Sequence, residues 1–257
     1  MASRLQVWLN RVILQRALAR WSANAMRVPA MSLRELRGLK GLAQQTGYAL
    51  DRLALEAGYR LAQPLQGEAM RRRQAGTDWH WRPDLWRGPV PVAGLTVSAG
   101  RTELAEGATL FQDCRQPEIC LLQLRNTGEG DTASCALRLE VFRFDGSFLS
   151  LVLDLPDSAA EGLKLRHLIR VEARIESDKP RPVYARLNIR HGPNVEQIPR
   201  QLELSEGQMI VDFDMAYSGV NEKRIEKLWI DLIFDDPAMS QIILRDLTVS
   251  RRPRAEL

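Results

Sequence analysis

Residues 166–176 read RHLIRVEARIE, and from Ile169 onward their side chains alternate between apolar and charged. The apolar positions are Ile169, Val171, Ala173 and Ile175, and the charged positions between them are Arg170, Glu172 and Arg174. Successive side chains of a β-strand point to opposite faces of its sheet. The alternation therefore predicts a strand with one face in a core and the other in water.

Eight further segments show a comparable β pattern, at residues 109–113, 119–126, 134–144, 147–155, 183–191, 208–217, 225–234 and 241–250. Asp145-Gly146, between two apolar-rich runs, is typical of a β-hairpin turn. The sequence between these segments has no helical pattern of any length. We therefore expect a mainly β fold over residues 89–257, a two-sheet antiparallel sandwich of the jelly-roll type.

The first 75 residues differ from this region in both charge and periodicity. They carry 13 Lys/Arg against 4 Asp/Glu, a net charge of +9, whereas residues 76–257 carry 23 against 28, a net charge of −5. Their apolar residues recur every three to four positions, as on a helix. We therefore expect a basic, amphipathic helical arm over residues 1–75, a linker over 76–88 and the sandwich after it.

The first expected helix, residues 3–27, has apolar side chains on two nearly opposite sides. Leu5, Trp8, Leu9 and Val12 occupy one side, and Leu14, Leu18, Trp21 and Ala25 the other, with Arg4, Arg11, Arg16, Arg20 and Arg27 among them. Such a helix fits between partners, or in a lipid headgroup zone with its arginines reaching outward. Trp8, Arg11, Arg16 and Trp21 are therefore candidate interface residues.

A second helix is expected to begin after Pro29, because Ser32 and Glu35 form a capping-box pattern. Its seam of small and apolar residues contains several glycines, each of which costs roughly 1 kcal/mol of helix stability relative to alanine. The helix therefore needs a packing partner. That partner is the first helix, the sandwich or another molecule.

Three tryptophans, Trp79, Trp81 and Trp86, fall within eight residues of the expected linker. If exposed, they would form a platform for a sugar ring, a lipid interface or a protein, so they are candidate interface residues. The alternative is a staple that folds this segment onto the sandwich.

The composition of the chain limits the cellular compartment and the cofactors that we expect for the protein. The three cysteines, Cys114, Cys120 and Cys135, show no CxxC spacing and are expected to be reduced, which favours the cytoplasm. No apolar window reaches the length that spans a bilayer, so we expect a cytoplasmic protein, at most peripheral to the inner membrane. The three histidines lack metal-ligand spacing, and neither a metal nor another cofactor is predicted.

Strand alternation assembles a candidate ligand-binding face on the sandwich. Its members are Tyr184, Arg186, Asn188 and Arg190 on one strand, Asp212 and Asp214 on the next, and Trp229 and Asp231, beside Lys227, on a third. Guanidinium, amide and aromatic groups side by side suit a sugar or a phosphorylated headgroup. A cross-strand ladder of ion pairs that only keeps the face hydrated is the alternative.

Catalysis and nucleic-acid binding find less support. Neither a nucleophile elbow nor a phosphate-binding loop occurs. Asp212 and Asp214 share a strand face and could act as a carboxylate pair of a glycan-active enzyme, although flanking arginines favour ordinary ion pairs. The basic residues of the arm are interleaved with apolar ones and show no nucleic-acid motif. No catalytic residue is predicted.

Four blocks of the chain, WHWRP at 79–83, FRFDGSFLSL at 142–151, ARLNIRHGPN at 185–194 and LRDLTVSRRPRAEL at 244–257, resemble an uncharacterised bacterial domain-of-unknown-function family. The resemblance covers nearly the whole chain and implies no activity and no site residues. The closing stretch ILRDLTV at 243–249 also resembles the last strand of galactose-binding-like jelly rolls and carbohydrate-binding modules, which implies binding more than catalysis.

These observations predict a non-enzymatic binding or scaffold protein. Its helical arm would hold the sandwich to an anionic membrane, a granule surface or a protein assembly. The alternative is a carbohydrate-binding module that uses the outer face of the sandwich, with the helices joining two copies of the chain.

Overall fold

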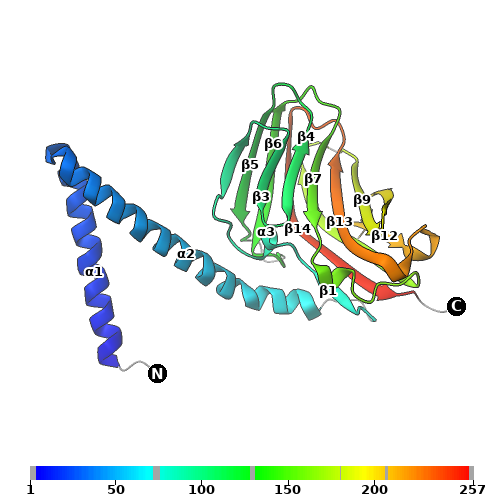
Figure 1. The fold of residues 1–257 in the computed structure, drawn as a ribbon, viewed down its shortest axis with the longest axis horizontal. Coiled ribbons are helices and arrows are strands. Elements are labelled where there is room, and N and C mark those ends of the chain that lie inside the picture. The colour runs from blue at the N-terminus through cyan, green and yellow to red at the C-terminus, as the bar shows by residue number, and fades with distance from the viewer. Residues whose placement is uncertain (1–3, 72–75, 128–130, 180, 206–207, 255–257) are drawn as a thin grey trace. The chain divides into compact units, whose positions relative to one another are not determined.

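The computed structural model describes residues 4–71, 76–127, 131–179, 181–205 and 208–254 (Figure 1). The chain divides into two compact units, Met1–Ala54 and Leu55–Leu257. The first is helical and the second is dominated by β-strands. This agrees with the mainly β fold and the preceding helical arm that the sequence predicts.

Helix α1 (Arg4–Arg27) ends at the short helix η1 (Val28–Ala30), whose second residue is Pro29. Helix α2 (Leu33–Arg71) then begins with the predicted capping box. The Ser32 backbone N–H donates to Glu35 Oε2 at 3.0 Å, and the Glu35 N–H donates to Ser32 Oγ at 3.4 Å. The hydrogen bonds from Ser32 lower the pKa of Glu35, because they stabilise its charged form.

Helix α2 continues to Arg71 although it contains Pro64 and Gly67, residue types that commonly interrupt helices. Proline removes one backbone hydrogen bond within a helix. Good helix formers such as Leu65 and Ala69 on the C-terminal side of Pro64 allow the remaining ladder to continue.

One sheet of the sandwich has eight strands, with seven in the order β11-β12-β8-β14-β6-β5-β2 and β1 paired to β14. In chain order these strands are β1 (Trp79–Trp81), β2 (Gly94–Val97), β5 (Glu118–Arg125), β6 (Cys135–Arg143), β8 (His167–Ser177), β11 (Glu203–Ser205), β12 (Gln208–Asp214) and β14 (Ser240–Pro253). Every strand pair in this sheet is antiparallel.

The other sheet has six strands in the order β10-β9-β13-β7-β4-β3. Their bounds are β3 (Arg101–Ala105), β4 (Ala108–Gln112), β7 (Leu149–Asp154), β9 (Val183–His191), β10 (Asn194–Gln201) and β13 (Ile225–Phe234). All of its pairs are antiparallel as well. In Figure 1 the two sheets lie face to face as the layers of a sandwich.

The core lies between the two sheets, as the alternation of apolar residues predicts. Val171 and Ala173 of β8 belong to the same continuous apolar cluster as Leu187 and Ile189 of β9, and all four are essentially inaccessible to solvent. Burial of apolar side chains from both inner faces is the main stabilising contribution in such a sandwich. All nine predicted strands occur, with ends that shift by up to three residues.

Five strands are not predicted from the sequence, namely β1, β2, β3, β10 and β11. Four of them have five residues or fewer, and β10 carries mostly polar side chains and Pro199 at the edge of its sheet. Short strands and polar edge strands give little periodic signal. Short helices fill connections, with α3 at Asp84–Arg87, η2 at Asp157–Ala159, η3 at Met215–Tyr217 and η4 at Glu222–Arg224.

Candidate functional site

The outer side of the six-stranded sheet carries most of the predicted ligand-binding residues. The cross-strand pairs between β9 and β13 are Tyr184 with Ile233, Arg186 with Asp231, Asn188 with Trp229 and Arg190 with Lys227. The side chains between them, such as Leu187 and Ile230, face the core. We call the outward set, Tyr184, Arg186, Asn188, Arg190, Lys227, Trp229 and Asp231, the β9–β13 face.

A hydrogen-bonded cluster occupies the centre of the β9–β13 face. Asp231 Oδ2 accepts from Arg186 Nε at 2.7 Å and lies 2.6 Å from a terminal nitrogen of the same guanidinium. The Asn188 amide donates to Asp231 Oδ2 at 3.1 Å and to the Arg186 backbone carbonyl at 3.1 Å. The Gln197 amide donates to Asn188 Oδ1 at 3.1 Å.

The residues of the β9–β13 face differ in their exposure to solvent. Asn188 and Asp231 are 0% and 2% exposed although they lie on the outer side of the sheet. Their hydrogen bonds are made within the protein, as buried polar groups require. They form a fixed floor, while Tyr184, Arg186 and Trp229 remain partly accessible above it. Arg190 is exposed and pairs with Glu226 at 3.1 Å.

Ser150 adds a polar group that the sequence analysis did not include. It lies on β7 between Ile233 of β13 and Phe111 of β4, in the same cross-strand row as Tyr184. Its side chain is buried, and its hydroxyl has no hydrogen-bond partner among the described residues. A lone serine between leucines in a strand carries no sequence signal of this placement.

Asp212 and Asp214 do not join the β9–β13 face, so this part of the predicted face is wrong. They lie on β12, which pairs with β8 in the other sheet. The chain runs from β9 through the hairpin to β10 and then crosses to the eight-stranded sheet. Strand alternation assigns a side chain to one of two sides of its own sheet and contains no information about which sheet that is.

On the eight-stranded sheet the two aspartates form ion pairs. Arg170 donates to both oxygens of Asp212, at 2.7 and 2.6 Å, and these hydrogen bonds raise the pKa of Arg170. Asp214 lies 3.3 Å from Arg254 and accepts from the Ala216 backbone N–H. The arrangement matches the ordinary ion pairs that the flanking arginines favour.

The tryptophan segment, predicted as part of a linker, belongs to the sandwich. Residues 79–81 form β1 against β14, and α3 follows at once. Trp86 is fully buried and its indole N–H donates to the Leu244 carbonyl at 2.9 Å, so its assignment to an exposed interface is wrong. Trp79 and Trp81 are half-buried against the core, and Trp79 donates to Ser158 Oγ at 3.1 Å. The segment is a staple.

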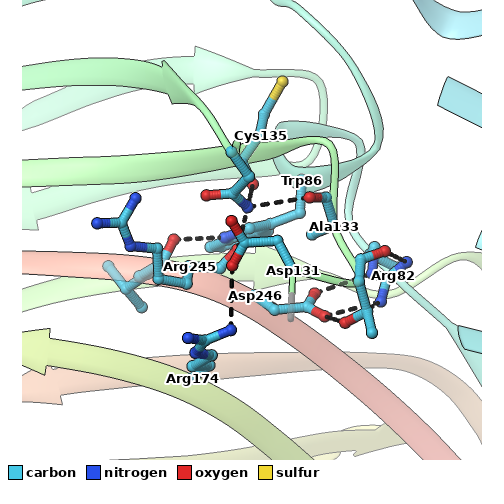
Figure 2. Close-up of polar contacts among 11 residues, drawn as sticks. Arg82, Trp86, Asp131, Ala133, Cys135, Arg174, Arg245 and Asp246 are labelled. Carbon is cyan, nitrogen blue, oxygen red and sulfur yellow. Dashed lines mark hydrogen bonds and ion pairs between the residues drawn. The ribbon is translucent and has the colours of Figure 1, made fainter. Parts of the chain in front are cut away.

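A buried ion pair completes this staple at an irregularity of β14. The register of β14 against β8 shifts between Leu244 and Asp246, which leaves Arg245 as an extra residue. Figure 2 shows the side chains of Arg82 and Asp246 facing each other beside this point. Two nitrogens of Arg82 donate to Asp246, at 2.9 and 2.7 Å, and Thr132 Oγ1 donates to Asp246 Oδ2 at 2.6 Å.

Asn126 bridges the strands around the same point. Its side-chain amide nitrogen lies within hydrogen-bond distance of three backbone carbonyls, those of Ala133, Cys135 and Arg245, at 3.0, 3.1 and 2.9 Å. Figure 2 labels Ala133, Cys135 and Arg245, the residues whose carbonyls Asn126 contacts. Together with the Arg82–Asp246 pair, these contacts attach the start of the sandwich to its last strand. The side-chain donors of Arg82, Asn126 and Thr132 all bond to acceptors within the protein, as in a structural network.

The helical unit exposes large apolar side chains. Trp8 is 61% exposed and Leu18 is 65% exposed, and Ile13, Leu14, Leu33, Leu42, Tyr48, Leu50 and Leu53 also face solvent. Arg11, Arg16 and Arg20 are exposed on the same helix, whereas Trp21 is half-buried. Residues 4–54 carry nine Lys/Arg and two Asp/Glu. The residues predicted as an interface thus remain accessible in this unit.

Cys114, Cys120 and Cys135 are free thiols. The Cys114 thiol donates to Asp145 Oδ1 at 2.7 Å, and this hydrogen bond lowers the pKa of Asp145. Across the described part of the chain, no cluster of three or more His, Cys, Asp and Glu side chains is placed to hold a metal ion. Of the helices in the described ranges, none combines the length and the apolar character needed to cross a membrane.

His167 is a buried histidine from which we expect a dependence of stability on pH. Its side chain is 3% exposed, with Nε2 3.4 Å from Asp78 and Nδ1 accepting the Lys164 backbone N–H at 2.9 Å. Burial lowers its pKa below the usual 6.5, Asp78 raises it, and Arg251, Arg166 and Lys164 lower it further. The unfolded chain therefore binds the proton more tightly, and stability present above about pH 6.5 is lost as the pH falls from that value through the lower pKa of the folded state.

We expect the melting temperature of the intact protein to decline between about pH 7 and pH 5, and to decline less in His167→Asn, whose amide oxygen can still accept the Lys164 N–H. Thermal unfolding followed by circular dichroism at several pH values measures this. The lowered pKa values of Asp113 and Asp145 act only below about pH 4. Parallel pH profiles of the two proteins would contradict the assignment to His167.

Similarity to solved structures is weak. The family 11 carbohydrate-binding module from Clostridium thermocellum, in complex with a β-1,3-1,4-mixed-linked tetrasaccharide, is 10% identical over 65% of this chain and 99% of its own, with a TM-score of 0.37. A xylan-binding domain of carbohydrate-binding module family 22 is 11% identical over 72% of this chain and 100% of its own, with a TM-score of 0.36.

The enzymatically active domain of tailspike protein 4 from bacteriophage CBA120 is 8% identical over 56% of this chain, with a TM-score of 0.38. The match spans only 19% of the phage chain. All three scores are low, and no ligand follows from them.

No curated protein matches the sequence. The sequence model of a family of unknown function, DUF6478, matches residues 1–257. This confirms the resemblance to an uncharacterised family that the four sequence blocks indicate. The chain belongs to the DUF6478 family.

Proposed function

We propose that this protein is a non-enzymatic binding protein whose helical unit attaches it to an anionic membrane surface. The observation that carries the proposal is the exposure of large apolar and arginine side chains on the same helices. Leu14 and Leu18 are 61% and 65% exposed, and Arg16 and Arg20 are exposed on nearly the opposite side of the same helix. A helix of this composition lies in a lipid interface with its cationic groups among the headgroups.

The expected energies support a membrane as the partner. Inserting one leucine side chain contributes about 1.5–3 kcal/mol. Each basic residue near an anionic leaflet adds about 1 kcal/mol. With nine basic and two acidic residues, the helical unit of a second copy would repel the first. Charge therefore favours an anionic surface over a dimer of the helices.

A second candidate function is the recognition of a glycan on the β9–β13 face. The observation that favours it is the fixed floor of Asn188 and Asp231 beneath the partly accessible Tyr184, Arg186 and Trp229. A rigid polar floor beside aromatic side chains lowers the entropy cost of binding a hydroxyl-rich ring. This site would leave the helical unit free for the membrane.

Cosedimentation of the intact protein with vesicles tests the membrane attachment. We expect binding to vesicles that contain phosphatidylglycerol, little binding to neutral phosphatidylcholine vesicles, and at least about hundredfold weaker binding for Leu14→Gln/Leu18→Gln, because two inserted side chains are lost. Val92→Gln/Met239→Gln is the matched control, since both residues are exposed on the sandwich.

Equal vesicle binding by the two double variants would reject the role of the helices. The same proteins applied to a glycan array separate the second candidate. Retention of the intact chain on a glycan, with loss in Trp229→Ala and no vesicle binding, would replace the membrane proposal by the glycan proposal.

A further inference from the structure

A crevice of about 420 Å³ lies between the two helices of the helical unit. Helices α1 and α2 meet at the turn Val28–Ala30 and diverge from it, as Figure 1 shows. Five lining residues come from α1 and three from α2, namely Arg16, Ala17, Arg20, Trp21, Asn24, Leu39, Leu42 and Thr46. The volume is within the range of small-molecule sites, about 300–1,000 Å³.

The walls of the crevice are apolar and its charged groups are cationic. Trp21, Leu39 and Leu42 are its large apolar lining residues. Arg16 and Arg20 are one helical turn apart, so both guanidinium groups project from the same side of α1. The crevice therefore offers a strip of apolar surface beside two cations.

Neither Arg16 nor Arg20 forms an ion pair within the described ranges of the chain. Arginines of the sandwich contrast with them, because Arg82 and Arg186 each contact a carboxylate within 3 Å. Glu35, the acidic residue nearest in sequence, is occupied by Ser32. The crevice thus places two unpaired guanidinium groups beside an apolar wall. A ligand that combines an anionic group with an apolar part would match both.

We propose that the crevice binds one anionic phospholipid, with its phosphate on Arg16 and Arg20 and the first part of an acyl chain against Trp21, Leu39 and Leu42. Arginine binds phosphate oxygens through paired N–H donors, which makes it suited to this group. Trp21 is half-buried, as is usual for an aromatic side chain at the boundary between headgroup and chain. A bare phosphate would leave the apolar walls without a partner.

This inference rests on the membrane attachment proposed above and adds a defined lipid site to it. Diffuse attraction depends only on net charge and on the apolar surface that inserts. A crevice site depends in addition on where the charge lies. Two variants that lose the same charge at different places therefore distinguish the two.

The test compares Arg16→Gln/Arg20→Gln with Arg34→Gln/Arg37→Gln in the full chain. All four arginines are exposed, and the second pair lies outside the crevice. Glutamine has a helix propensity close to that of arginine, so both variants retain their helices, which circular dichroism verifies. We expect vesicle affinity to fall on the order of tenfold for the second pair and at least a further tenfold for the first.

Titration calorimetry with a soluble short-chain phosphatidylglycerol, below its micelle concentration, gives the second measurement. We expect one lipid per chain for the intact protein and for Arg34→Gln/Arg37→Gln, and none for Arg16→Gln/Arg20→Gln. Two results together would overturn the crevice site and leave the membrane attachment intact. They are an equal loss of vesicle affinity in the two variants and no binding of the soluble lipid to the intact protein.

Two other outcomes would also reject the lipid site. Inorganic phosphate that binds as tightly as the short-chain lipid would show that the apolar walls are not used. An intact protein that binds the soluble lipid but no vesicle would overturn the membrane as the source of the lipid and, with it, the proposed attachment.

Discussion

Replacing Asp246 by alanine is expected to lower the free energy of unfolding of the sandwich by about 3–5 kcal/mol. The side chain of its partner Arg82 is 6% exposed and donates two hydrogen bonds to Asp246. Without the carboxylate, a charged guanidinium remains buried and Thr132 Oγ1 loses its acceptor. Urea denaturation of the full chain, followed by tryptophan fluorescence, measures the change.

Asp212→Ala is the matched control. It removes another aspartate that accepts two hydrogen bonds from one arginine, but the Asp212 side chain is 36% exposed. The Arg170 side chain is 15% exposed and keeps Glu172 at 3.7 Å after the substitution, so a loss of at most about 1 kcal/mol is expected. Equal losses of unfolding free energy in the two variants would show that burial does not increase the contribution of the Arg82–Asp246 pair to stability.

Trp86→Ala is expected to destabilise the sandwich by about 3–5 kcal/mol. Trp86 is fully buried against the apolar cluster, and its indole N–H is the donor to the Leu244 carbonyl. The substitution leaves a cavity and an unsatisfied carbonyl in β14. Trp86→Phe separates the two effects, because it keeps most of the apolar volume and removes the donor, at a cost of about 1–3 kcal/mol.

Trp8→Ala, in the helical unit, is the control for Trp86→Ala. Trp8 is 61% exposed, so Trp8→Ala should alter the free energy of unfolding by less than about 0.5 kcal/mol while weakening vesicle binding. The midpoint of urea denaturation, measured for both alanine variants, makes the comparison. A small loss in Trp86→Ala would mean that the staple packs loosely on the sandwich.

Local sequence pattern predicts much of this fold because its causes are local. Alternation along 166–176 identifies β8 and the side of it that faces the core, and Ser32 with Glu35 identifies the start of α2. The β9–β13 face also follows from alternation, since Arg186 and Asp231 lie on the outer sides of their strands. None of these assignments requires a distant contact.

The errors and the omissions concern residues whose environment is set by distant parts of the chain. Trp86 is 158 residues from Leu244, the residue whose carbonyl accepts its indole N–H. Arg82 is 164 residues from Asp246. Nothing near either residue in the sequence distinguishes a buried tryptophan or an ion-paired arginine from an exposed one. The burial of Ser150 depends likewise on the strands on both sides of it.

The sequence by itself determined which segments are helix or strand, which side chains share a face, and how charge divides between the helical unit and the sandwich. Backbone geometry and the solvent preference of side chains act over a few residues, so these properties follow from the local sequence. Only the tertiary structure decided that Asp212 lies in a different sheet from Arg186, that Trp86 closes the core and that Asn188 is buried. Those outcomes depend on how strands far apart in the chain pair and pack, and packing is a property of the whole fold.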